Sequence, residues 1–66
     1  MSMDQNLARL QQNIARMRRD IRLQAWEMQQ LADANLDCTA SAQLLVRMQA
    51  DLKLFLETRD RLAERA

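Results

Sequence analysis

Few side chains in this 66-residue chain could perform chemistry. Cys38 is its single cysteine, and it contains no histidine, tyrosine or glycine. A catalytic thiol needs a base and positive surroundings, whereas Cys38 follows Asp37 and has no histidine to activate it. A carboxylate-bundle metal site needs Glu-x-x-His pairs, which are missing. We therefore expect no catalytic residue, metal or cofactor, and a protein that is not an enzyme. Cys38 is expected to pack at the start of a helix.

Arginines are concentrated in one segment. Residues 9–22 contain five arginines and one acid, Asp20. One hypothesis is a phosphate-binding patch that a dimer would double, as in RNA-binding bundles. The other is a solvated face whose arginines pair with Asp20, Glu27 or acids of the second half. We favour the second, since net charge is only +1 and aromatic residues for base stacking are scarce. The candidate nucleic-acid contacts are Arg16, Arg18, Arg19 and Arg22.

The elements that position these residues are indicated by apolar spacing. Apolar side chains recur at alternating intervals of three and four in both halves of the chain, the heptad pattern of packed helices. We call the following residues the seam: Leu7, Leu10, Ile14, Met17, Ile21, Met28, Leu31, Leu45, Met48, Leu52, Phe55 and Leu62. Gln24 and Arg59 fill two intervening positions. They either reach solvent at an edge or form a polar layer that fixes register.

The stretch "LADANLDCTAS", residues 31–41, interrupts the pattern without glycine or proline. Asn35 is the best non-glycine residue there for the left-handed conformation that ends a helix. Leu36 is then expected to be buried against the last helical turn. Asp37 and Thr39 are both suitable N-caps for a second helix. The sequence thus predicts a compact reversal between antiparallel helices.

The predicted fold is all-α: a coiled-coil-like antiparallel hairpin in one domain, residues 1–66. We expect a helix over 3–34, a turn over 35–38 and a helix over 39–64. A chain this short usually needs a disulfide, a metal or a partner chain, and its composition favours the last. Because Leu44 and Leu56 widen the second seam, we expect a homo-oligomer, with a dimeric four-helix bundle favoured.

Apolar residues away from the seam suggest a second interface. Leu23 and Trp26 are three residues apart in the first helix, and Val46 and Leu54 lie on the back of the second. Exposed tryptophan beside leucine is typical of interface anchors. Alternatively, the bundle buries a wider face. The candidate partner surface is Leu23, Trp26, Val46 and Leu54.

Residues 32–62 resemble a set of small proteobacterial proteins, familiar from rhizobia, that share a G-h-D-T turn, a paired leucine and a late R-D-R-L. The matching segments are Asn35-Leu36-Asp37-Cys38, Leu44-Leu45 and Arg59-Asp60-Arg61-Leu62. Asn35 stands where glycine is usual and Cys38 where threonine is usual. The resemblance implies a helical hairpin and no established activity. In architecture the chain is also similar to the Rop family of plasmid copy-number regulators, dimeric hairpins that bind paired RNA loops.

Location and role follow from the same features. No apolar run is long enough to span a bilayer, and the first residues, MSMDQNLARL, lack the apolar region of a signal peptide. With one cysteine, a reducing cytoplasm is the expected location. We expect a self-associating adaptor or regulator with a protein partner. The alternative is a Rop-like RNA- or DNA-binding regulator that uses the Arg16–Arg22 cluster.

Overall fold

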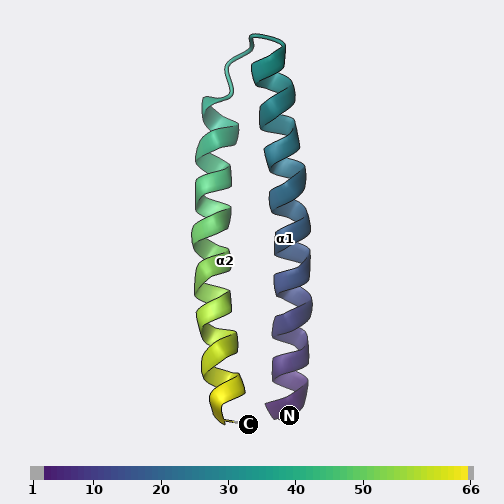
Figure 1. The fold of residues 1–66 in the computed structure, drawn as a ribbon, viewed down its shortest axis with the longest axis vertical. Coiled ribbons are helices and arrows are strands. Elements are labelled where there is room, and N and C mark those ends of the chain that lie inside the picture. The colour runs from purple at the N-terminus through teal and green to yellow at the C-terminus, as the bar shows by residue number, and fades with distance from the viewer. Residues whose placement is uncertain (1–2, 66) are drawn as a thin grey trace.

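The computed structural model describes residues 3–65, which form two antiparallel helices, α1 (Met3–Asp33) and α2 (Thr39–Arg65) (Figure 1). The start of α1 and the end of α2 lie at one end of a rod, and the turn lies at the other. The rod measures 49 × 15 × 14 Å. The predicted all-α hairpin is confirmed. Helix α1 ends one residue before the predicted boundary, and α2 extends one residue beyond it.

The core of the rod is thin. Ile14 is 3% exposed and is the one buried hydrophobic residue within the described part of the chain. The other eleven seam residues are half-buried. Since two helices can cover only one side of each other's apolar stripe, the rest of that stripe stays open to solvent. The hairpin therefore leaves unburied much of the apolar area that would stabilise it.

The turn begins with a left-handed residue at the end of α1. Asn35 has φ 58°, as predicted. Its backbone N–H donates to the carbonyl of Ala32 at 3.0 Å, and that of Leu36 donates to the carbonyl of Leu31 at 2.8 Å. These two bonds form a Schellman motif and satisfy carbonyls that α1 leaves open. The expected burial of Leu36 is wrong: its side chain is 59% exposed. The backbone bonds suffice for the reversal, and a two-helix rod offers no third element to cover Leu36.

Helix α2 is fixed at its start by Asp37. The Oδ1 atom of Asp37 accepts hydrogen bonds from the Thr39 hydroxyl at 2.6 Å and from the Thr39 backbone N–H at 2.9 Å. The first helical bond of α2 runs from Ala42 N–H to the carbonyl of Cys38, at 2.9 Å. The hydroxyl bond, followed by the backbone bond, lowers the pKa of Asp37, because both stabilise the ionised carboxylate.

The two polar seam positions are half-buried, in line with their neighbours. Arg59 donates through Nε and one terminal nitrogen to Oδ1 of Asp60, at 3.2 and 3.1 Å. Asp60 is the next residue of α2, and its side chain is 64% exposed. Arg59 therefore pairs its charge with an exposed acid of its own helix. Gln24 occupies the corresponding inner position of α1.

Candidate interaction surfaces

Residues 3–65 contain no group of three histidine, cysteine or acidic residues placed to hold a metal ion. Cys38 has a free thiol and is half-buried beside the turn. Within the same range, neither helix combines the length and the apolar character that crossing a membrane requires. The candidate residues of this chain are side chains on the outer faces of the two helices.

The arginine cluster lies on the surface of α1. Arg16, Arg18, Arg19 and Arg22 are all exposed. Arg16 donates to the side-chain oxygen of Asn13 at 3.2 Å. The expected pairing of these arginines with Asp20, Glu27 or acids of α2 is not found, since Arg59–Asp60 is the one ion pair in the described residues. The cluster is therefore exposed to solvent and forms no ion pair with a described acid.

The four residues of the candidate partner surface are also exposed. Leu23 is 58% exposed, Trp26 62%, Val46 66% and Leu54 60%. Leu23 and Trp26 are one turn apart on α1, while Val46 and Leu54 are two turns apart on α2, so the set is divided between the outer sides of both helices. Leu44, which the sequence assigned to a widened seam, is 45% exposed as well. The hairpin by itself buries none of these side chains.

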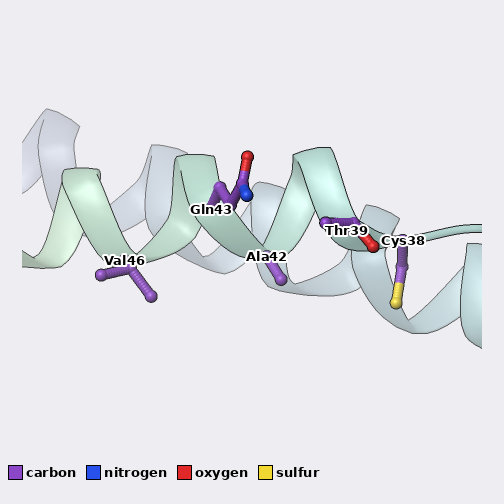
Figure 2. Close-up of a pocket in the computed structure, with 5 residues that line it drawn as sticks. All are labelled: Cys38, Thr39, Ala42, Gln43 and Val46. Atoms are coloured by element: carbon purple, nitrogen blue, oxygen red, sulfur yellow. The ribbon is translucent and has the colours of Figure 1, made fainter.

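An open depression near the turn is lined by Cys38, Thr39, Ala42, Gln43 and Val46. Figure 2 shows the side chains of Cys38, Ala42 and Val46 on the same side of α2, with Gln43 directed away from them. Of the four residues of the candidate partner surface, Val46 alone lines this depression. Spacing by four residues along one helix accounts for this row. That spacing was visible in the sequence, but Cys38 and Ala42 were not recognised as neighbours of Val46.

A second depression lies between the helices. It is lined by Met17 and Asp20 of α1 and by Met48 and Asp51 of α2. Both aspartates are exposed, and each immediately precedes a seam residue, Ile21 or Leu52. The depression establishes that these two positions face the same side of the hairpin. We call this side the Asp20/Asp51 face.

The hairpin thus has an exposed basic cluster, exposed apolar residues on both helices, and shallow depressions near the turn, beside Leu44 on α2 and between the helices. Comparisons of the chain with protein-family models, with curated proteins and with solved structures gave no match.

Proposed function

We propose that this protein is a small helical hairpin that self-associates, as a homodimeric four-helix bundle, and acts as a protein-binding adaptor or regulator. The observation that carries the proposal is the imbalance of burial. One residue is buried, whereas six large apolar side chains are 45–66% exposed. Isolated exposed apolar residues are ordinary, but this many on so small a chain favour an interface.

Energetics support self-association. In the lone hairpin one described residue is buried, which leaves little apolar burial to offset the loss of chain entropy. A second hairpin would cover the open part of both seams, with helix packing of the kind found in four-helix bundles. Sedimentation equilibrium over a wide concentration range tests this. The expected result is a dimer mass, and a folded monomer at the highest concentration would contradict the proposal.

Trp26 is the residue most suited to anchor a protein partner. Tryptophan buries a large area at an interface, and Trp26 is 62% exposed on the outer side of α1. Tagged protein should retain its partners after nuclease treatment, and Trp26→Ala should reduce their recovery. Gln30→Ala, an exposed change one turn further along α1, is the matched control. Equal recovery by the wild type and Trp26→Ala would remove Trp26 from the interface.

A second candidate function is nucleic-acid binding through the arginine cluster. Its support is that Arg16, Arg18, Arg19 and Arg22 are exposed and form no ion pair with any described acid. Such arginines are available to neutralise phosphates, and binding should weaken steeply as salt rises. A gel shift with structured RNA at low salt tests this function. If the wild type retards the RNA, Arg18→Glu/Arg22→Glu should abolish that retardation. If the wild type does not retard the RNA at all, the nucleic-acid-binding function is excluded.

A further inference from the structure

The Asp20/Asp51 face carries three of the six exposed large apolar side chains. Leu23 follows Asp20 by three residues and Leu54 follows Asp51 by three, so helical geometry places each on the side of its aspartate. Leu44 precedes Asp51 by seven residues, two turns along the same side. Their exposed fractions are 58%, 60% and 45%. This face is therefore apolar at three places and acidic near its middle.

Charges along α1 on this face have a symmetric order. Arg9, Arg16, Asp20 and Glu27 are separated by seven, four and seven residues, which keeps them on one side of the helix. All four are exposed and none forms an ion pair within the described residues. The two arginines and the two acids are symmetric about residue 18, which is also the midpoint of α1 (Met3–Asp33).

When two copies of α1 lie side by side, this order of charges places arginines opposite acids only if the two helices are antiparallel. If two copies of α1 lie antiparallel and overlap fully, each Arg9 lies opposite a Glu27 and each Arg16 opposite an Asp20. If the second hairpin is instead stacked with its turn at the same end, α1 faces α2 of the other copy. Each Asp20 then lies opposite an Asp51, because the two positions lie level along the rod, and a contact between like charges replaces the Arg16–Asp20 contact.

Charge is also distributed unevenly along the whole rod, and this distribution favours the same direction of stacking. Residues 23–46, around the turn, contain three acids and no Lys or Arg, so they carry a charge of −3. The rest of the chain contains ten Lys and Arg and six acids, a charge of +4. Stacking with the turns at opposite ends brings each negative end onto a positive end. Stacking with both turns at one end brings like charges together.

We propose that a second copy of this chain docks on the Asp20/Asp51 face with its turn at the opposite end of the rod. The inference rests on the proposed self-association and adds its face and direction. The area is adequate: the whole rod measures 49 × 15 × 14 Å, so one long side is of the order of the roughly 800 Å² that each partner buries in a stable complex. This dimer covers Leu23 and Leu54 and leaves Trp26 and Val46 for another partner.

The single cysteine provides a test of direction. A nitroxide spin label on Cys38 reports the distance between the two turns of a dimer by pulsed electron resonance. With turns at opposite ends, the labels are separated by most of the 49 Å rod. With turns at one end, they lie within about 20 Å, since packed helices are about 8–10 Å apart. Because Cys38 is half-buried, Cys38→Ser/Ala32→Cys, labelled at an exposed position near the end of α1 and away from the docking face, repeats the measurement.

The outcomes separate this inference from the proposal on which it depends. A long distance in a dimer of confirmed mass supports it. A short distance in such a dimer overturns the docking direction and leaves self-association standing. A monomer by sedimentation equilibrium, measured on the unlabelled chain, overturns both.

Exchanging the charges of residues 9 and 27 tests the proposed docking face. Arg9→Glu should raise the dimer dissociation constant about tenfold, since it replaces two opposite-charge contacts by like-charge contacts. Glu27→Arg should act similarly, and the double variant Arg9→Glu/Glu27→Arg should restore the wild-type value. Residues 9 and 27 are about 27 Å apart along one helix, so restoration must arise between copies. Lys53→Glu, the same charge change on another side of the rod, is the control. Failure of the double variant to restore dimerisation would overturn the docking face.

Discussion

At the scale of single residues, Asn35 and Asp37 determine how the chain reverses. Asn35 adopts the left-handed conformation, which costs most L-residues about 1–2 kcal/mol and Asn less. Asp37 satisfies the first donor of α2 through its carboxylate. The absence of glycine therefore does not prevent a short turn.

Substitution of Asn35 should show this conformational preference. Asn35→Gly should preserve or increase stability, because glycine enters the left-handed region without penalty. Asn35→Ala should lower the free energy of unfolding by about 1 kcal/mol, measured by urea unfolding at fixed protein concentration. Equal stability of the Ala and Gly variants would contradict the role given to φ at this position.

Acid should weaken the start of α2 through Asp37. The pKa of this carboxyl is lowered in the folded chain, so its contribution is complete above the ordinary aspartate range, near pH ~3.9. That contribution is lost as pH falls through the lowered pKa. Thermal unfolding followed by circular dichroism should show this loss in the wild type. Asp37→Asn keeps an acceptor oxygen but cannot titrate, so its melting temperature should fall less between pH 7 and pH 2. Parallel acid profiles for both proteins would contradict the assignment.

At the scale of elements, each helix depends on the other. Helices α1 and α2 contain 31 and 27 residues, and their apolar stripes supply the main reason for packing. Ile14 alone is buried among the described residues. The half-buried state of the remaining seam means that one neighbour supplies only part of the burial that the heptad pattern allows.

Truncation of seam residues should therefore report on a second copy. Ile14→Ala should lower the free energy of unfolding by about 2–4 kcal/mol both in a lone hairpin and in a bundle, since its site is already enclosed. Ile21→Ala and Leu52→Ala should cost about 2–4 kcal/mol in a bundle that covers them, and about 1–2 kcal/mol in a lone hairpin. Chemical unfolding at a concentration that saturates the dimer measures all three. No loss of stability from Ile21→Ala and Leu52→Ala would contradict their place in the seam.

At the scale of the whole molecule, a nearly neutral chain is electrically polar. Net charge is +1, yet negative charge gathers around the turn and positive charge elsewhere. Arrangement of charge, and not its sum, therefore governs how two rods approach each other.

Ionic strength should accordingly affect dimerisation in a defined direction. Salt screens exposed charges over about 10 Å at 0.1 M, so a dimer with its turns at opposite ends should weaken as sodium chloride rises from low to moderate concentration. Sedimentation equilibrium at several salt concentrations measures this. A dimer that tightens with salt would indicate that like charges meet, as expected for turns at the same end.

The sequence by itself determined the two helices, the position of the turn and the left-handed Asn35, because helix periodicity and turn chemistry are local properties of the chain. The tertiary structure decided which residues of α1 lie level with which residues of α2. It brought Asp20 and Asp51 to one face and left Leu36 uncovered. The apolar stripes predict which sides of the helices meet, but the level at which they meet depends on the packed pair, so the charge symmetry of α1 could be assigned to a face only when both helices were in place.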